Sequence, residues 1–215
     1  MTESSHGIIL RTRPLTETSL IVHWLTPDLG RIATVAKGAR RPKSPFAGKL
    51  DLFYAADFSF SRSRRSELHA LREVSLRETH GAIREELARL QQAGYAAAFI
   101  EQATETETPL PEVFELLRAF LAHLCAVTPQ PQDIFLLELK LLRQLGLEPD
   151  LAEAPVTPGV KRIMEALLQG DWAACARLKL TGAQAGELRQ FLQSFLVFHL
   201  GRLPRGRGGA VAGPV

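Results

Sequence analysis

Five short runs of β-forming residues occupy the first 75 positions of the chain, and proline, glycine or polar residues separate them. They cover residues 7–13, 19–25, 31–36, 53–60 and 68–74. In the fourth run, Phe58 and Phe60 alternate with polar neighbours, as in a half-buried strand. No intervening segment has room for a crossover helix, so the strands must form an antiparallel sheet or a small barrel. Five strands fit an OB-fold, and a five-stranded SH3-like barrel would give the same pattern.

Helical periodicity replaces this pattern from about residue 81. An apolar stripe at i, i+3, i+4, i+7, i+8 and i+11 comprises Val113, Leu116, Leu117, Phe120, Leu121 and Leu124. Residues 132–145 are apolar on most sides, which predicts a buried helix that Gly146 ends. A capping box at 181–184 opens a last helix, which Gly201 closes. We therefore predict an α+β chain, with a β domain over residues 1–80 and an α-helical domain over 81–202.

Two further segments are expected to lie outside regular structure. Residues 148–159 contain three prolines and form a connector within the helical domain. Residues 203–215 are rich in glycine and contain two prolines. We expect this tail to be disordered.

Charge is distributed unevenly along the chain. Residues 1–80 hold 13 Lys and Arg against 8 Asp and Glu, whereas residues 81–160 hold 5 against 12. Residues 161–215 are basic again, with 8 against 3. This segregation indicates at least two surfaces with different partners, although helix surfaces rich in glutamate would give a similar pattern by chance.

A cationic loop lies between the third and fourth β-like runs. Lys37, Arg40, Arg41 and Lys43 place four positive charges within seven residues, and Gly38 and Pro42 break the chain there. A permissive cationic loop on a small β-rich unit can follow a phosphate backbone. Nucleic acid is therefore the first partner to test.

The sequence lacks the familiar motifs of catalytic and metal sites. The chain contains no phosphate-binding glycine loop, dinucleotide-binding turn or nucleophile elbow. His123 and Cys125 lie two residues apart, so on a helix they point about 200° from each other and cannot share a proton. We expect His123 on a helix surface. No histidine has ligand spacing with Cys, Asp or Glu, so we predict no enzyme, no catalytic residue, no metal and no cofactor.

The two cysteines and the lack of targeting signals bear on location. Cys125 and Cys175 lie fifty residues apart in apolar surroundings and are expected to be buried thiols in a reducing compartment. No segment is long and apolar enough to cross a membrane, and no signal peptide is apparent. These features predict a cytoplasmic protein without a membrane partner.

Several segments resemble the RecO family of bacterial recombination mediators. They are residues 7–11, 17–22 and 26–31, the stretch from Val35 to Ser44, the helix end at 142–149, and the closing helix at 195–202. The match follows the family's order over nearly the whole chain, and the Val35–Ser44 stretch is its most specific part. The resemblance implies an N-terminal OB-fold followed by an α-helical domain.

The resemblance also implies function. Members of this family bind single- and double-stranded DNA, anneal complementary strands, and cooperate with RecR in loading RecA, without a nucleotide cofactor. They also bind the acidic C-terminal tail of single-stranded DNA-binding protein. We thus expect a nucleoid-associated bacterial protein. Many relatives carry two Cys-x-x-Cys pairs that hold zinc, but residues 151–159 here contain no cysteine. The connector at 148–159 is expected to be short and to bind no zinc.

The DNA-binding residues are predicted from charge, since lysine and arginine neutralise phosphates and release counterions. One group follows the cationic loop and its flanks, and a second follows the polar turn after the fourth β-like run: Arg31, Lys37, Arg40, Arg41, Lys43, Lys49, Arg62, Arg64 and Arg65. Phe46 either stacks on a base or plugs one end of the barrel. A solvated loop that only maintains solubility is the alternative.

The acidic peptide implied by the resemblance needs an apolar notch edged by cations. Within the acidic helical region, Arg118, Lys140 and Arg143 lie beside leucines and are the candidates. The alternative is that they are ordinary solvated positions of amphipathic helices. Two other functional classes share many of these features, namely a general RNA-binding OB protein and a helical protein–protein adaptor.

Overall fold

The computed structural model describes residues 2–212 and divides into two compact units. Unit 1 comprises Met1–His80 and Thr104–Arg118, and unit 2 comprises Gly81–Ala103 and Ala119–Val215. Unit 1 thus breaks off after His80 and resumes at Thr104. Residues 104–118, expected in the helical domain, instead group with the barrel, because residue 106 forms a strand bridge with Arg31.

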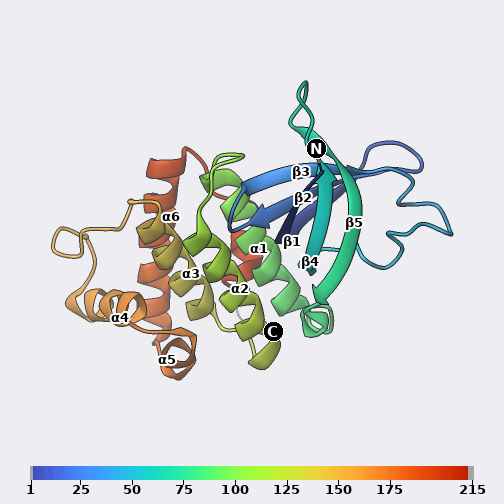
Figure 1. Cartoon of the computed structure of the whole chain (residues 1–215). Helices are drawn as coiled ribbons and strands as arrows, with labels where there is room; N and C mark the ends of the chain where they lie inside the picture. Colours follow the sequence, from blue (N-terminus) through green and yellow to red (C-terminus); the bar gives the residue numbers. More distant parts are fainter. Residues whose placement is uncertain (1, 213–215) are drawn as a thin grey trace. The chain divides into compact units, whose positions relative to one another are not determined.

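Unit 1 is a closed five-stranded barrel with the strand order β1-β2-β3-β5-β4 (Figure 1). The strands are β1 (Thr2–Pro14), β2 (Leu20–Thr26), β3 (Gly30–Ala36), β4 (Ala55–Ser61) and β5 (Leu68–Glu78). Neighbouring strands are antiparallel except β3 and β5, which pair in parallel. This arrangement is that of the OB-fold and confirms the predicted fold class.

Aromatic side chains fill the barrel. Trp24 is completely buried, stacks on Phe58 with ring centroids 4.2 Å apart, and donates its indole N–H to the Thr34 hydroxyl at 2.9 Å. Phe60 is also completely buried. Every second residue of β3 and β4 points inward, which follows the alternation in the sequence. A buried tryptophan whose N–H has a partner anchors the core without an unsatisfied donor.

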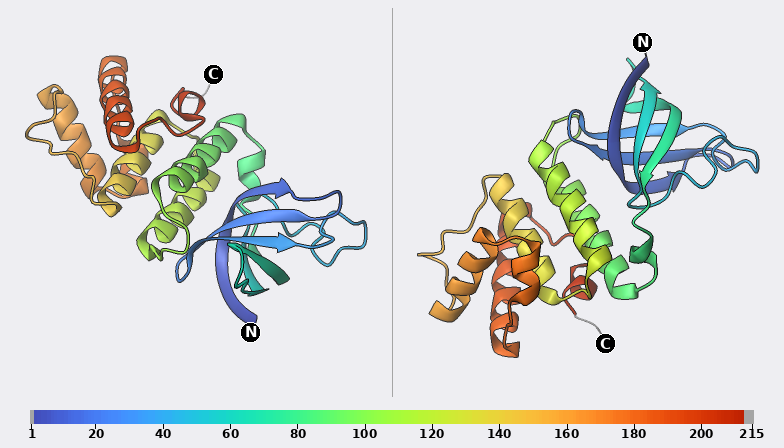
Figure 2. Two further views of the ribbon diagram at one scale, coloured as in Figure 1. Left: turned by 90° about the horizontal axis from the view of Figure 1, so that it is seen from above. Right: turned by 60° about the horizontal axis from the view of Figure 1, so that its bottom comes forward.

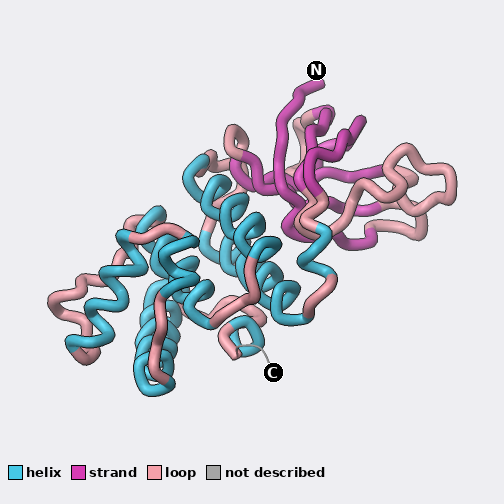
Figure 3. Tube along the Cα trace, turned by 90° about the horizontal axis from the view of Figure 1, so that it is seen from below, coloured by secondary structure: helices cyan, strands magenta, loops and turns pink. Residues whose placement is uncertain are grey.

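Two connections of the barrel are prominent. The segment between β3 and β4 is a long loop beyond the strands (Figure 3), and the β4–β5 connection protrudes as a narrow loop (Figure 1). After β5, a 3₁₀ turn, η1 (Gly81–Arg84), precedes the helices.

Unit 2 is helical (Figure 2). Its helices are α1 (Leu87–Ala103), α3 (Pro131–Gln144), α4 (Pro158–Gln169), α5 (Trp172–Arg177), α6 (Gly182–Leu200) and α7 (Arg207–Ala210), and α2 (Pro111–Ala126) spans both units. As predicted, α3 is buried on most sides and contacts α1, α4, α5 and α6. Gly146 follows it with φ +71°, and the Thr181 hydroxyl caps α6 by accepting from the Gln184 N–H.

The tail differs from its expected disorder. Residues 203–212 are ordered, with α7 packed against α1. Arg207 of α7 is buried and pairs with Glu138 of α3 at 2.7 Å. Glycine-rich composition predicted disorder because it offers little apolar surface. The buried ion pair anchors the tail, together with the buried side chains of Ala210 and Val211 and a hydrogen bond from the Gln92 amide to the Ala210 carbonyl at 3.1 Å. Residues 213–215 of the predicted tail lie outside the described residues.

His123 also differs from its expected place on a helix surface. It is buried, donates or accepts at 3.0 Å with Asp133, and stacks on Trp172. Cys175 is buried as predicted, and burial raises the pKa of its thiol well above the usual range. Cys125 is only half-buried.

Candidate nucleic-acid interface

The loop that follows β3, residues 37–49, is hereafter called the basic loop. Successive tight turns shape it, since the N–H groups of Arg41, Ser44, Ala47 and Lys49 each donate to a carbonyl three residues earlier, at 3.0–3.1 Å. Gly38 has φ +70°, which suits a residue without a side chain. The four cations predicted between positions 37 and 43 are all exposed to solvent. The basic loop therefore holds these charges on a defined backbone.

The basic loop is attached to the β1–β2 connection. The Arg40 N–H donates to the Thr18 carbonyl at 3.0 Å, and its guanidinium donates to the Thr16 carbonyl at 3.3 Å. The Gly38 N–H approaches the Ser19 hydroxyl at 3.5 Å. In OB-folds the β1–β2 and β4–β5 loops flank the surface that binds oligonucleotides. These contacts place the predicted cations at one of the two flanks.

A cavity of about 490 Å³ lies on the outer face of β1, β2 and β3, and it is hereafter called the strand-face cavity. The strands contribute Arg11, Arg13, His23 and Arg31 to its lining. Residues 66 and 67 of the β4–β5 connection and Leu68 at the start of β5 also line it. Arg11 and His23 are direct cross-strand partners. The cavity thus has three guanidinium groups around one imidazole, on the face that OB-folds use for ligands.

The pKa of His23 is affected by the positive charges around this cavity. Its pKa is lowered to about 4, chiefly by burial and in addition by the positive charges of Arg11, Arg13 and Arg31. Its Nε2 is buried and has no hydrogen-bond partner among the described residues. A neutral imidazole with one free nitrogen, surrounded by cations, can accept or donate a hydrogen bond to a nucleotide while the arginines contact phosphate.

Arg31, which is predicted to contact DNA, also forms hydrogen bonds within the protein. Its guanidinium donates to the hydroxyl of Thr104 at 2.8 Å and to the carbonyl of Thr104 at 2.5 Å. Its carbonyl accepts from the Glu107 N–H at 2.9 Å. Residues 104–108, hereafter the clasp segment, are held to β3 by these bonds. Arg31 therefore contributes positive charge to the cavity, while its guanidinium N–H groups hold the clasp segment to the barrel.

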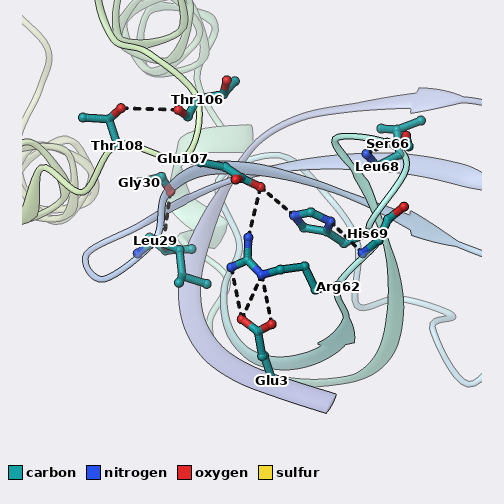
Figure 4. Close-up of polar contacts among 12 residues, drawn as sticks. Glu3, Leu29, Gly30, Arg62, Ser66, Leu68, His69, Thr106, Glu107 and Thr108 are labelled. Atoms are coloured by element: carbon teal, nitrogen blue, oxygen red, sulfur yellow. Dashed lines mark hydrogen bonds and ion pairs between the residues drawn. The ribbon is translucent and has the colours of Figure 1, made fainter. Parts of the chain in front are cut away.

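Arg62 is likewise engaged within the protein (Figure 4). It begins the β4–β5 loop, and its guanidinium pairs with Glu3 at 2.9 Å and with Glu107 at 3.2 Å. These carboxylates raise its pKa, and Arg62 in turn lowers the pKa of Glu3. Arg64 and Arg65 of the same loop are exposed, and the backbone N–H of Arg65 donates to the Ser63 hydroxyl at 3.3 Å. The second predicted group of cations thus comprises two solvated arginines, Arg64 and Arg65, and one paired arginine, Arg62.

Phe46 does not present its ring to a base. It is 6% exposed and packs in the barrel core with Ile9, Trp24 and Phe58. Of the two roles considered, this buried position favours the plug. Its neighbour Lys49 is half-buried and lines a separate open cavity of about 700 Å³ with Arg72.

The three cations predicted for an acidic peptide have different surroundings. Arg118, in unit 1, pairs with Glu115 at 2.8 Å. Arg143, in unit 2, pairs with Glu148 at 2.6 Å and donates to the Leu168 carbonyl. Lys140 is half-buried, and burial followed by the charge of Arg143 lowers its pKa. Two of the three predicted cations therefore already have carboxylate partners.

Sequence reasoning missed Arg11, Arg13 and His23. Arg11 and Arg13 lie two residues apart in a strand, so they share a face, and this spacing was a usable signal. The pairing of β1 with β2, which brings His23 beside Arg11, is a long-range relationship that spacing alone does not fix. Among residues 2–212 no cluster of three or more His, Cys, Asp or Glu could hold a metal ion. No helix in the described part of the chain is long and apolar enough to cross a membrane.

Comparison with known proteins identifies the family. Residues 1–80 match the family model described as Recombination protein O N terminal, and residues 84–154 match Recombination protein O C terminal. The DNA repair protein RecO of Anaeromyxobacter dehalogenans strain 2CP-C is 32% identical over 230 residues, which cover 91% of each chain. The DNA repair protein RecO of Bacillus subtilis strain 168 is 32% identical over 151 residues, covering 70% of this chain and 58% of that protein. The chain therefore belongs to the recombination protein O family.

Proposed function

We propose that this protein is a DNA repair and recombination mediator that binds single- and double-stranded DNA through its barrel. The observation that supports this most is the strand-face cavity, where Arg11, Arg13 and Arg31 surround His23 on the ligand face of an OB-fold. The basic loop continues the cationic surface at one flank. Contacts of this kind neutralise phosphates and carry little sequence information, so binding is expected to be sequence-independent.

The same proposal includes annealing of complementary strands and cooperation with RecR in loading RecA onto strands coated by single-stranded DNA-binding protein. Annealing requires that one protein surface neutralise the backbones of two strands while leaving their bases free to pair. A cationic surface without an exposed aromatic platform suits this task, since Phe46 and Trp24 are buried and do not sequester bases. The protein would then act on the bacterial nucleoid.

For the acidic tail of single-stranded DNA-binding protein we propose the C-terminal half of α3, where Lys140 and Arg143 lie three positions apart. A pull-down with the tail peptide tests this. Lys140→Glu combined with Arg143→Glu should abolish capture, and Arg118→Glu should not. Equal capture by both variants would exclude α3 as the peptide site.

The decisive functional test is annealing of two complementary oligonucleotides coated with single-stranded DNA-binding protein, with and without RecR. The proposal predicts annealing above the spontaneous rate. An RNA-binding role predicts that RNA of equal length outcompetes DNA, because a 2′-hydroxyl would then be read. Failure to bind either nucleic acid at low salt would instead indicate a helical adaptor.

A further inference from the structure

All three guanidinium nitrogens of Arg62 are occupied by carboxylates of the protein itself (Figure 4). Its Nε donates to both oxygens of Glu3 at 2.9 and 3.2 Å, and its Nη2 donates to Glu3 at 3.0 Å. Its Nη1 donates to Glu107 at 3.2 Å. Arg62 thus lies in the cationic β4–β5 loop while its charge is neutralised from two sides.

Both the backbone and the carboxylate of Glu107 are fixed by specific contacts. Its backbone has φ +53°, in the left-handed region that favours glycine and costs other residues free energy. The bond from its N–H to the Arg31 carbonyl holds the backbone there, and its carboxylate also lies 2.9 Å from Nε2 of the buried His69. Strained backbone of this kind persists where the surroundings enforce it and often marks a functional position.

Glu107 also lines the strand-face cavity, together with Arg11, Arg13 and His23. An anionic side chain therefore lines the same cavity as three arginines that can attract phosphate. Glu67 also lines the cavity, but it belongs to the β4–β5 loop and forms no side-chain bond within the described residues. Glu107 both lines the cavity and bonds to Arg62.

The pair formed by Glu107 and Arg62 is too exposed to be explained by stability. Their side chains are 45% and 36% exposed, and ion pairs at such positions contribute little to folding because water and salt screen them. The same exposure makes the pair easy to exchange. A phosphate that reaches Arg62 can replace Glu107 with small cost.

We propose that Glu107 is an internal competitor of nucleic acid, which holds Arg62 until a backbone phosphate displaces it. Through Glu107, the clasp segment thereby weakens DNA binding. Arg62 becomes available to a phosphate only when a strand occupies the cavity. This inference rests on the proposed DNA binding. It assigns to residue 107 the regulation of that same site.

The test is fluorescence anisotropy of labelled oligo(dT) with the full chain across a salt series. Glu107→Gln keeps an oxygen for Arg62 and His69 but removes the charge, and Glu105→Gln, an exposed position in the clasp segment, is the matched control. Glu107→Gln should tighten binding about threefold at low salt and steepen the salt dependence by about 0.7, the value for one released cation. Glu105→Gln should leave the slope unchanged.

Two further variants separate competition from a general charge effect. In an Arg62→Ala chain, Glu107→Gln should no longer tighten binding, and Glu3→Gln should tighten binding in the unsubstituted background. The inference would be overturned if Glu107→Gln and Glu105→Gln had equal salt slopes, or if Glu107→Gln still tightened DNA binding in the Arg62→Ala chain. The proposal of DNA binding would stand in either case. Absence of binding by the unsubstituted chain at low salt would refute the proposed function, and this inference with it.

Discussion

The guanidinium of Arg207 donates two hydrogen bonds to the carboxylate of Glu138, at 2.7 and 2.9 Å, with both side chains almost completely buried. The Tyr95 hydroxyl donates to the same carboxylate at 2.5 Å. Burial and the charge of Glu138 raise the pKa of Tyr95, so the hydroxyl stays protonated and available as a donor. This three-residue network joins α7 to α1 and α3 and explains why a glycine-rich tail is ordered.

Replacing Arg207 by Met should destabilise unit 2 by about 3–5 kcal/mol, because Glu138 would remain buried without its cation. Urea unfolding followed by far-ultraviolet circular dichroism measures this, since most helices belong to unit 2. Arg205→Ala, at an exposed position two residues away, should change stability by less than about 0.5 kcal/mol. The double variant Arg207→Met with Glu138→Leu should be more stable than Arg207→Met alone. Similar effects of the substitutions at 205 and 207 would contradict a network role.

Phe46→Ala should destabilise the barrel by about 3–5 kcal/mol, because it leaves a cavity in the core. Phe46→Leu should retain most of the stability and bind single-stranded DNA as tightly as the unsubstituted chain. Thermal unfolding and anisotropy at one salt concentration measure the two properties. A folded Phe46→Leu chain with tenfold weaker binding would show that the ring contacts bases after all.

The fold was largely predictable because its determinants are local. Burial alternates along β3 and β4 with the period of a single strand. The apolar stripe through Val113 and Phe120 has the period of a single helix. The partners of charged residues were not predictable. Arg62 lies 45 positions from Glu107, and Arg207 lies 69 positions from Glu138, so only the tertiary structure brings them together.

The candidate site was predictable only in part. Exposed charges in the basic loop follow from glycine, proline and lysine in a short segment. The strand-face cavity depends on the register of β1 against β2, which pairs Arg11 with His23. Phe46 was ambiguous because an aromatic residue in a cationic loop can equally stack on a base or close a core.

His23 should make stability pH-dependent between its folded pKa of about 4 and its ordinary value of 6.5. In this range the unfolded chain binds a proton that the folded chain does not, so stability falls as the pH decreases from 6.5 to about 4. Urea unfolding of the unsubstituted chain and of His23→Gln at a series of pH values measures this. The variant should lose less stability on acidification, and parallel pH profiles would contradict the lowered pKa.

DNA should raise the pKa of His23, because backbone phosphates near Arg11 and Arg13 offset the positive potential that disfavours its protonation. Nuclear magnetic resonance titration of the His23 ring, with and without an oligonucleotide, measures the change. His199, which is exposed on α6, is the internal control, and its ring signals should not respond to the oligonucleotide. An unchanged His23 midpoint at saturating DNA would show that the strand runs elsewhere.

The most direct measurement is the salt dependence of single-stranded DNA binding by a chain in which Lys37, Arg40, Arg41 and Lys43 are all Ala. The matched control removes four exposed cations of unit 2 instead, namely Arg162, Arg177, Lys179 and Arg189. If the barrel binds DNA, the loop variant should bind more weakly, and its salt slope should fall by about three, at roughly 0.7 per lost phosphate contact. The control should retain the original slope. An unchanged slope in the loop variant, or an equal loss in the control, would contradict DNA binding through the basic loop of the barrel.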